Sequence, residues 1–376
     1  MTTLMIVAGE ASGDLHGAEI LSVLKELCPD LRIVGVGGKK MSQFLDKKLA
    51  DVSDLGVVGF FEVVRHLPKI LRLEKQILEQ AEEENASVAL LIDYQSFNLR
   101  LAKSLRKRRP SMLLCQYVCP QVWAWKANRI PKLGSILNIL YCLFDFEPPL
   151  FKDHPVEAIC LGHPLVDLVK PDLDRDSFIR DYSLVNDKPI VALLPGSRMS
   201  EITRLLPAML EMVRNWDQSD AKPVQWVLPV ASTLDPAILK AAIGDLPIHI
   251  IEERNSYSAR AYADAALVCS GTATLETAIL GTPFAILYRM NPFTLAMARR
   301  LVKIDHFGLA NVVAGRQVAR ELLQEEVSPA GLHEELLRLL EPANSVVIRQ
   351  DLAMFKERLG EAGAAERVAR HLASKL

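Results

Sequence analysis

The sequence lacks the marks of several large protein classes. Its six cysteines are scattered along 376 residues, and no pair has the spacing of a zinc ribbon. Four of them fall in apolar runs, which indicates buried, reduced thiols in a cytosolic protein. The formal net charge is only −2, which argues against general nucleic-acid binding, although local basic clusters are compatible with it.

Long apolar runs are also missing. The longest apolar window, Leu133 to Phe146, contains Asn138 and Asp145 and falls short of the ~20 residues that span a bilayer. The chain enters a strand at Leu4 without a preceding basic segment, so we expect no signal peptide. These absences predict a protein that is soluble or peripheral to a membrane.

A third absence concerns the first strand and turn. Leu4 to Ala8 predicts a buried strand, and a helix is predicted from about Leu15 to Leu27. The turn between them, Gly9 to Asp14, lacks the Gly-x-Gly-x-x-Gly spacing of dinucleotide-binding folds, which leaves a dinucleotide oxidoreductase as the weakest reading. The turn follows the first strand, where open α/β sheets place ligands.

Strands and helices alternate in both halves of the chain, which predicts an α/β fold with parallel sheets. At roughly 150 residues per domain, the length suggests two domains. The charged, apolar-poor segment from Pro171 to Asp176 indicates a linker near residues 165 to 188. We expect Rossmann-like domains over 1–165 and 186–340, C-terminal helices over 341–376, and no strand after Gln317. Asp172-x-Asp174 is similar to a metal–diphosphate motif, but it follows no buried strand and a solvated linker is favoured.

The stretch from Val268 to Pro283 predicts a strand, a Ser-Gly-Thr turn, a helix and a second strand. Glycine lets a ligand approach the backbone, and the amides at a helix start can bind an anion. Glu276, one turn into the helix, could accept hydrogen bonds from ribose hydroxyls. The pattern is that of a nucleotide-diphosphate site formed by Ser270, Gly271, Thr272 and Glu276. An ordinary turn with Glu276 in solvent would give the same pattern.

Two further turns in the second half suit phosphate. Ser197 and Arg198 follow the predicted strand Ile190–Leu194 and precede a helix, and arginine can bind oxyanions through two hydrogen bonds. Asn311, in a short turn, could donate to phosphate. In the first half, Asp93 follows the predicted strand Val88–Ile92, a suitable place for a general base. A helix N-cap is the structural alternative for Asp93.

Residues 57 to 78 mix apolar and basic side chains, which suits a helix lying in a membrane interface. Core packing would explain the same aliphatic residues, but the cations favour a membrane-facing helix. Pro68 is expected to start a new helix or to kink this one. The Trp123–Trp125 loop could hold an amphiphile or simply be packed. The predicted membrane or acyl-chain residues are Val63, Val64, Arg65, Leu67, Lys69, Ile70, Leu71 and Arg72.

Six motifs, in order along nearly the whole chain, resemble the lipid-A-disaccharide synthase family. They are Ala8–Asp14, Gly56–Gly59, Tyr117–Trp125, Gly162–Pro164, Leu194–Arg198 and Ser270–Glu276. The resemblance implies a GT-B type fold, in which two Rossmann-like domains face a central cleft. It also implies an inverting transfer of 2,3-diacylglucosamine from UDP to 2,3-diacylglucosamine 1-phosphate. The products would be a β-1,6-linked disaccharide phosphate and UDP.

The resemblance also implies roles for single residues. Asp93 matches the proposed base, and Glu10 and Ser12 match an essential loop on the acceptor side. Ser197 and Arg198 would stabilise charge on the leaving diphosphate. The amides at Gly271 and Thr272, and Asn311, would assist them, while Glu276 would hold the ribose.

No metal and no cofactor is implied. The expected partners are the two substrates, a membrane surface on the inner face of the bacterial inner membrane, and a second copy of the chain, but no nucleic acid. Cys119-Pro120-Gln121 departs from the family, where small polar residues are common.

Two other readings share part of this pattern. Another GT-B transferase, or a UDP-sugar 2-epimerase, would share the Ser-Gly-Thr…Glu turn. The epimerase would not need the basic, apolar helix or the double-tryptophan loop. A peripheral membrane protein without catalysis would keep the helix but would not need Asp93 or Arg198.

Overall fold

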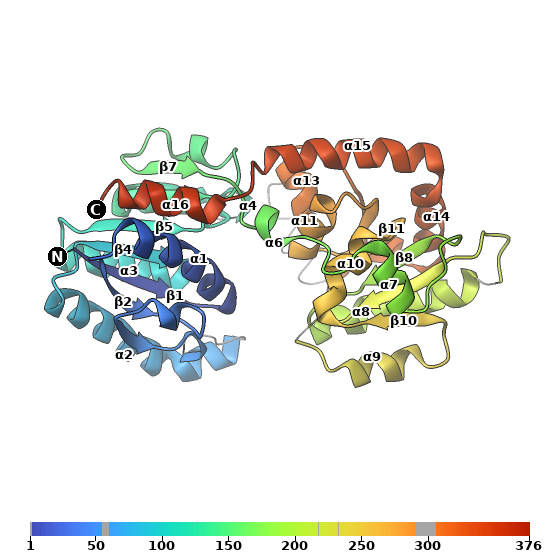
Figure 1. Cartoon of the computed structure of the whole chain (residues 1–376), viewed down its shortest axis with the longest axis horizontal. Helices are drawn as coiled ribbons and strands as arrows, with labels where there is room; N and C mark the ends of the chain where they lie inside the picture. The colour runs from blue at the N-terminus through green and yellow to red at the C-terminus, as the bar shows by residue number, and fades with distance from the viewer. Residues whose placement is uncertain (1, 55–59, 126, 217, 232, 291–305) are drawn as a thin grey trace. The chain divides into compact units, whose positions relative to one another are not determined.

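The computed structural model describes residues 2–54, 60–125, 127–216, 218–231, 233–290 and 306–376, without the side chains of residues 54, 60–67 and 125. The chain forms two compact units (Figure 1). The first comprises Met1–Pro164 and Leu359–Leu376, and the second comprises Leu165–Arg358. Each is built on one parallel sheet.

The first unit contains a seven-stranded sheet in the order β3-β2-β1-β4-β5-β6-β7, in which every neighbouring pair is parallel. Its central strands are continuous aliphatic runs, as expected of strands covered on both faces. The strands are β1 Thr3–Ala8, β2 Arg32–Val36, β3 Lys47–Ala50, β4 Val88–Ile92, β5 Leu113–Tyr117, β6 Ile139–Cys142 and β7 Glu157–Cys160.

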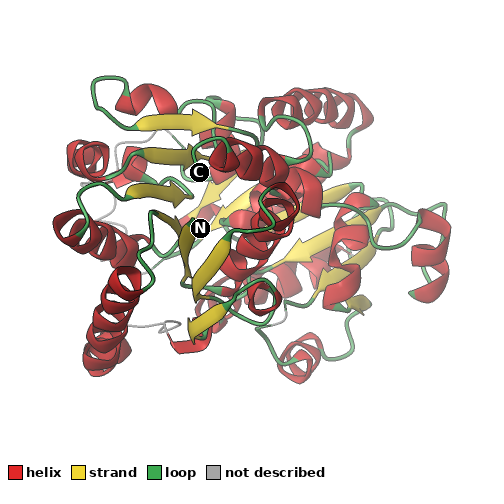
Figure 2. Ribbon diagram, turned by 60° about the vertical axis from the view of Figure 1, so that its left-hand side comes forward, coloured by secondary structure: helices red, strands yellow, loops and turns green. Residues whose placement is uncertain are grey.

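Side chains of β1 alternate between two hydrophobic cores. Leu4, Ile6 and Ala8 pack in the core that contains residues of α1 and α16, whereas Met5 and Val7 pack in the core that contains residues of α2 and α3. Helices therefore cover both faces of the sheet (Figure 2). The helices of this unit are α1 Ala11–Leu27, α2 Phe60–Glu83, α3 Gln95–Arg108, α4 Val122–Trp125, α5 Ile130–Ile136 and α16 Ala364–Ala373.

The second unit contains a six-stranded parallel sheet in the order β10-β9-β8-β11-β12-β13. The strands are β8 Ile190–Leu194, β9 Gln225–Pro229, β10 Ile248–Ile251, β11 Ala265–Cys269, β12 Phe284–Tyr288 and β13 Arg320–Leu323. The helices are α6 Leu165–Leu168, α7 Arg175–Asp181, α8 Met199–Trp216, α9 Pro236–Ile243, α10 Ser256–Ala261, α11 Thr272–Ile279, α13 Leu309–Ala314, α14 Pro329–Leu340 and α15 Pro342–Arg358.

Both sheets reverse their strand order at one place. In the first unit, β2 lies on one side of β1 and β4 on the other; in the second, β9 and β11 flank β8 in the same way. At such a switch point the connections leave in opposite directions and open a crevice at the carboxyl ends of the strands, where α/β proteins bind ligands. The turns predicted as sites follow β1, β4, β8 and β11, the four strands at these points.

The structure divides the chain differently from the predicted domains. Residues 165 to 188, expected as a linker, belong to the second unit, because α7 packs against α10 and α6 against α11. The C-terminal helices also separate. α15 packs in the second unit on α11 and α14, whereas α16 lies along α1 in the first unit (Figure 1).

One local prediction is wrong. β13, at Arg320–Leu323, is a strand in the region expected to be purely helical after Gln317. Helix α2 runs through Pro68 without a new start there. None of the helices in the described part of the chain combines the length and apolar character that crossing a membrane requires.

Candidate active site

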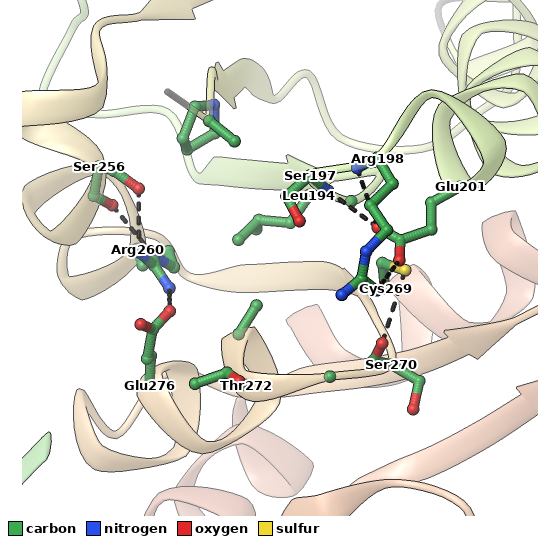
Figure 3. Close-up of a pocket in the computed structure, with 15 residues that line it drawn as sticks. Leu194, Ser197, Arg198, Glu201, Ser256, Arg260, Cys269, Ser270, Thr272 and Glu276 are labelled. Carbon is green, nitrogen blue, oxygen red and sulfur yellow. Dashed lines mark hydrogen bonds and ion pairs between the residues drawn. The ribbon is translucent and has the colours of Figure 1, made fainter. Parts of the chain in front are cut away.

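A pocket of about 360 Å³ lies in the second unit, at the carboxyl ends of β8 and β11 (Figure 3). Two turns and one helix contribute most of its polar groups. The pocket is lined by Leu194, Gly196, Ser197, Arg198, Glu201, Pro229, Ala231, Ser256, Arg260, Cys269, Ser270, Gly271, Thr272, Ala273 and Glu276. It therefore brings together the predicted residues of both phosphate turns and Glu276.

The turn after β8 is closed by a carboxylate. Gly196 takes φ +116°, which favours glycine, and a Cβ there would lie 2.4 Å from Oε2 of Glu201. The backbone amides of Ser197 and Arg198 donate to that oxygen at 2.9 and 3.2 Å. Glu201 thus occupies the position that an oxyanion would take at these amides. The sequence alone did not predict this contact.

Arg198 remains well placed for an anion. Its side chain is 74% exposed, and Nη1 donates to Oε1 of Glu201 at 3.0 Å. One edge of the guanidinium is thereby oriented while other N–H groups can reach a ligand in the pocket. At this turn the guanidinium is therefore better suited to a diphosphate than the amides are.

The turn after β11 is open. Gly271 takes φ +151°, and a Cβ built there would meet no atom within 4 Å, so the backbone conformation is what favours glycine. Helix α11 begins at Thr272, and Gly271, Thr272 and Ala273 line the pocket. The amides of a first helical turn have no intrahelical partner and carry partial positive charge. The Ser270 hydroxyl donates to the Phe307 carbonyl at 3.4 Å.

Glu276 is held by a buried arginine. Arg260 Nη1 donates to Glu276 Oε2 at 2.5 Å, and the two side chains are 6% and 18% exposed. Arg260 also donates to Ser256, from Nε to the carbonyl at 3.2 Å and from Nη2 to the hydroxyl at 2.9 Å. In Figure 3 this cluster lies at the opposite end of the pocket from Arg198 and Glu201. A carboxylate so oriented can accept hydrogen bonds from a diol.

Tyr257 completes this cluster. Its hydroxyl donates to Glu276 Oε1 at 3.3 Å, and the Arg260 guanidinium lies 4.8 Å from the ring centroid. Burial, and then the charge of Glu276, raises the pKa of Tyr257 to about 12. Sequence reasoning missed Ser256, Tyr257 and Arg260. An arginine in a short Ser/Ala-rich helix gives no signal that distinguishes it from a solvated one.

Asn311 is a correction to the predicted site. The residue is fully buried, and its Nδ2 donates to the Ala319 carbonyl at 2.7 Å and to Glu321 at 2.8 Å. Its Oδ1 accepts from the amides of Val318 and Ala319 at 2.8 and 3.0 Å. Because these bonds use both ends of the amide, Asn311 has a structural role before β13, which removes it from the predicted phosphate ligands.

In the first unit, the predicted loop and the predicted base lie at the other switch point. Glu10 and Ser12 are exposed at the start of α1, after β1. A Cβ at Gly9 would lie 2.4 Å from Tyr94 Cβ, so the loop packs directly on the residue that follows Asp93. Burial raises the pKa of Tyr94, and the Glu10 charge raises it further. Glu10 and Asp93 therefore share one end of the sheet.

Asp93 is half-buried and does not cap a helix. The N-cap of α3 is Tyr94, and its side chain makes no capping bond. Within the described residues the Asp93 carboxylate makes no hydrogen bond. Asp93 and Tyr94 both have a left-handed backbone conformation, with φ of +52° and +39°. This conformation costs a non-glycine residue about 1–2 kcal/mol. Strained backbone of this kind is common at functional sites.

Asp14 is a buried residue of the same loop whose contacts are structural. Its carboxylate accepts from the amides of Gly38, Lys40 and Met41 at 2.6, 3.0 and 3.0 Å. Three such bonds tie the start of α1 to the loop after β2. The glycine-rich segment after β2 is thus an anchored turn.

The predicted membrane helix is only partly described. The side chains of Val63, Val64, Arg65 and Leu67 lie outside the described residues. Lys69, Leu71 and Arg72 are exposed, whereas Ile70 is buried in the core cluster, which removes it from the predicted membrane face.

In the tryptophan loop, the side chain of Trp123 is packed. Trp123 Nε1 donates to buried Glu147 at 3.1 Å, and its ring meets Phe146 edge-on at 5.4 Å. Within the described residues, Cys119, Cys142 and Glu147 bring their possible metal-ligand atoms within 4.8 Å of one another. The hydrogen bond with Cys142, and then burial, raises the pKa of Cys119, and Glu147 also accepts from the amides of Leu143 and Phe144. These bonds assign the trio a structural role.

Comparisons with known proteins give a consistent result. The family model described as lipid-A-disaccharide synthetase matches residues 4–373. A lipid-A-disaccharide synthase of Syntrophus aciditrophicus (strain SB) is 40% identical over 369 residues, which cover 97% of this chain and 96% of that protein. These matches extend over both units.

The solved structures that resemble the chain show its fold. A putative UDP-N-acetylglucosamine 2-epimerase from Listeria monocytogenes superposes with a TM-score of 0.67 at 16% identity, covering 99% of this chain and 96% of that one. The calicheamicin glycosyltransferase CalG4 gives 0.60 at 15% identity, covering 100% and 98%. The expected GT-B type fold, with two Rossmann-like domains, is confirmed, and at these identities the likeness does not extend to activity.

Proposed function

The chain belongs to the lipid-A-disaccharide synthetase family and is a glycosyltransferase of lipid A biosynthesis, and we propose that it uses UDP-2,3-diacylglucosamine as the donor. The acceptor is 2,3-diacylglucosamine 1-phosphate, and the transfer inverts the anomeric configuration. The products are the lipid A disaccharide 1-phosphate and UDP.

The observation that carries this proposal is the pocket of the second unit. It combines an exposed guanidinium, the open N-terminus of α11 and an oriented carboxylate. A UDP-sugar requires these three features, because its diphosphate is anionic and its ribose is a diol. Arg198 and the amides at Thr272 bind the diphosphate, and Glu276 accepts from the ribose hydroxyls.

The chemistry needs a base and a stabilised leaving group. Asp93 takes the proton from the acceptor 6-hydroxyl as its oxygen attacks the anomeric carbon. The bond to the diphosphate breaks with its electron pair, and Arg198 stabilises the charge that develops on UDP. Glu10 and Ser12 hold the acceptor beside Asp93. The proposal uses no metal ion.

The test is a thin-layer assay with both substrates in detergent and EDTA. We expect the wild type to form the disaccharide and Asp93→Asn to lose at least 100-fold in kcat, with UDP affinity by calorimetry unchanged. Asp187→Asn, at an exposed carboxylate before β8, is the matched control and should keep full activity. Loss of UDP binding in Asp93→Asn would assign Asp93 a structural role, and an inactive wild type would refute the reaction.

We also propose that the protein is peripheral on the inner face of the bacterial inner membrane. Both substrates carry acyl chains, and Lys69, Leu71 and Arg72 expose a basic and apolar surface on α2. Lys69→Glu/Arg72→Glu should release the protein from vesicles containing anionic lipid. Arg180→Glu, an exposed charge in the second unit, should not. Unchanged sedimentation of the double variant with vesicles would contradict this proposal.

A homodimer is the third part of the proposal, and it rests on the family resemblance. Helix α15 exposes Val346, Val347 and Met354, each more than half exposed, which is an apolar surface available to a second copy. Sedimentation equilibrium across a range of concentrations tests it. A monomer at micromolar concentration would contradict it.

A further inference from the structure

We infer that Asn98 is a positioning residue for the transfer reaction, because its buried side-chain amide holds the strained turn that carries Asp93. The inference rests on the proposed role of Asp93 as the base. Asn98 lies one turn into α3 and is fully buried, so it does not touch a substrate itself. Any effect on the reaction must therefore pass through the groups that it holds.

The side-chain amide of Asn98 donates to the two carbonyls on either side of the Asp93 Cα. Nδ2 donates to the Ile92 carbonyl at 3.1 Å and to the Asp93 carbonyl at 2.7 Å. One NH2 group thus fixes the peptide planes on both sides of the Asp93 Cα. Since those planes set the direction of the Cα–Cβ bond, they also set where the carboxylate points.

Other contacts hold the turn from outside but do not replace this bridge. The amide of Asp93 donates to the Tyr117 carbonyl at 2.6 Å, which ties the turn to the end of β5. The amide of Asn98 donates to the Tyr94 carbonyl at 3.1 Å, which belongs to the start of α3. Two consecutive left-handed non-glycine residues persist only where their surroundings over-determine them. The side chain of Asn98 supplies the bonds to the two carbonyls on either side of the Asp93 Cα, those of Ile92 and of Asp93 itself.

Only the donor end of this side chain is used. Within the described residues, Asn98 Oδ1 has no hydrogen-bond partner although it is buried. An unpaired buried oxygen destabilises the fold. An apolar residue would fill the same space without that cost, so the benefit of asparagine here lies in the two bonds that its NH2 group donates. The two donated bonds, made at the expense of an unpaired oxygen, therefore favour a role in positioning the Asp93 turn over a role in packing alone.

The experiment compares kinetic constants in the full-length enzyme. We expect Asn98→Ala to lower kcat at least 10-fold, while KM for the UDP-sugar and the Kd for UDP stay within about twofold, because the UDP pocket lies in the second unit. Gln225→Ala is the matched control. Its amide also donates to two carbonyls, those of Val185 and Lys188 at 2.8 and 3.1 Å, but at the start of β9, away from the pocket. It should lower the melting temperature and leave kcat of the folded enzyme unchanged.

A second comparison isolates the backbone role. Tyr94→Gly allows the left-handed conformation without strain, whatever its own effect on kcat. In that background Asn98→Ala should cost several-fold less in kcat than it does in the wild type. An equal cost in both backgrounds, or an unchanged kcat for Asn98→Ala, would overturn the inference. So would a loss of UDP affinity parallel to the loss of kcat.

Failure of the proposed function is distinguishable in the same assay. If the wild type forms no disaccharide, or if Asp93→Asn is active, then the reaction or its base is wrong. If the wild type is active, Asp93→Asn is inactive and Asn98→Ala is fully active, only the inference about Asn98 fails.

Discussion

Breaking the ion pair between Arg260 and Glu276 should destabilise the second unit by an amount that depends on which partner is removed. Glu276→Ala removes the ion-pair partner of Arg260, whose side chain is only 6% exposed. Its remaining contacts are the two bonds to Ser256 and the ring of Tyr257. Removing one partner of a buried pair typically costs about 3–5 kcal/mol. Because these contacts persist, we expect Glu276→Ala to lower the free energy of unfolding of the second unit by about 3 kcal/mol, the lower end of that range.

The reverse change should cost less. Arg260→Ala leaves the Glu276 carboxylate, which is 18% exposed, lines the pocket and keeps the Tyr257 hydroxyl as a donor. Water in the pocket can then solvate the carboxylate, so we expect roughly 1–2 kcal/mol. In the double variant no charge is stranded. The two losses should therefore not add, and the coupling free energy should be about 1–3 kcal/mol.

Scanning calorimetry of the full-length chain measures these costs. For a unit of 150–250 residues, 1 kcal/mol corresponds to about 2–4 °C, so Glu276→Ala should lower the melting temperature of the second unit by about 6–12 °C. Arg254→Ala is the control, since that arginine pairs with Glu252 at 79% exposure and should contribute almost nothing. Additive losses in the double variant would refute the coupling.

The same variants test the proposed role of Glu276 in UDP binding. Hydrogen bonds to a charged acceptor contribute about 1.5–3 kcal/mol, so Glu276→Ala should weaken UDP binding by about 10- to 100-fold. Arg260→Ala should weaken it by less, because the carboxylate is kept but is no longer oriented. Calorimetric titration with UDP below the melting temperature measures both. Equal UDP affinity in the wild type and Glu276→Ala would remove Glu276 from the binding site.

Three further predictions concern the first unit. Gly9→Ala should force the loop away from Tyr94, because the new Cβ would lie 2.4 Å from that side chain. We expect kcat to fall at least 10-fold while UDP affinity is kept. An unaffected kcat would contradict the packing. Asp14→Ala leaves three backbone amides without their acceptor and should cost about 2–4 kcal/mol in denaturant unfolding; a loss below ~0.5 kcal/mol would contradict the anchor. Burial raises the pKa of Glu147 to about 6, so the folded state binds its proton more tightly, and the stability this gives at low pH is lost as pH rises from about 4.5 to 6. The stability of the wild type relative to Glu147→Gln should therefore fall by about 2 kcal/mol between a pH well below 4.5 and a pH well above 6, and a constant difference would be inconsistent with the shift.

The central strands could be predicted from the sequence, whereas the edge strands β3 and β13 could not. Val88–Ile92 and Ile190–Leu194 are uniformly apolar because both faces of each strand are covered. β3 begins with Lys47 and Lys48, and β13 with Arg320 and Glu321. An edge strand tolerates such charges, so its sequence lacks the apolar run.

The charges on β13 are satisfied by partners that only the fold supplies. Glu321 accepts from the amides of Phe307 and Gly308 at 2.9 Å, and Arg320 donates to buried Glu335 at 3.2 Å. A charged strand of this kind reads as helix or loop in the sequence alone. The same limit applies to Asn311, whose partners come from the segment just before β13.

The site was predictable where it depends on strand ends. Ser197, Gly271, Glu10 and Asp93 each lie within three residues of the end of an apolar strand, and the carboxyl ends of parallel strands lie at one edge of their sheet. Residues that act through tertiary contacts gave no such signal. Arg260 enters the pocket only because α10 packs beside β9, and Glu201 reaches back to the turn that precedes its own helix.

The charges at the two switch points support the proposed division of the reaction between the two units. In the second unit both carboxylates of the pocket are paired with a cation, Glu201 with Arg198 and Glu276 with Arg260, so the exposed side of the Arg198 guanidinium and the helix start of α11 can attract an anion. In the first unit the Asp93 carboxylate has no such cation within the described residues. A diphosphate placed there would be repelled, whereas a hydroxyl group about to lose its proton would be favoured. This charge pattern supports the proposed binding of the donor by the second unit and of the acceptor by the first, because the opposite assignment would bring the diphosphate close to the Asp93 carboxylate.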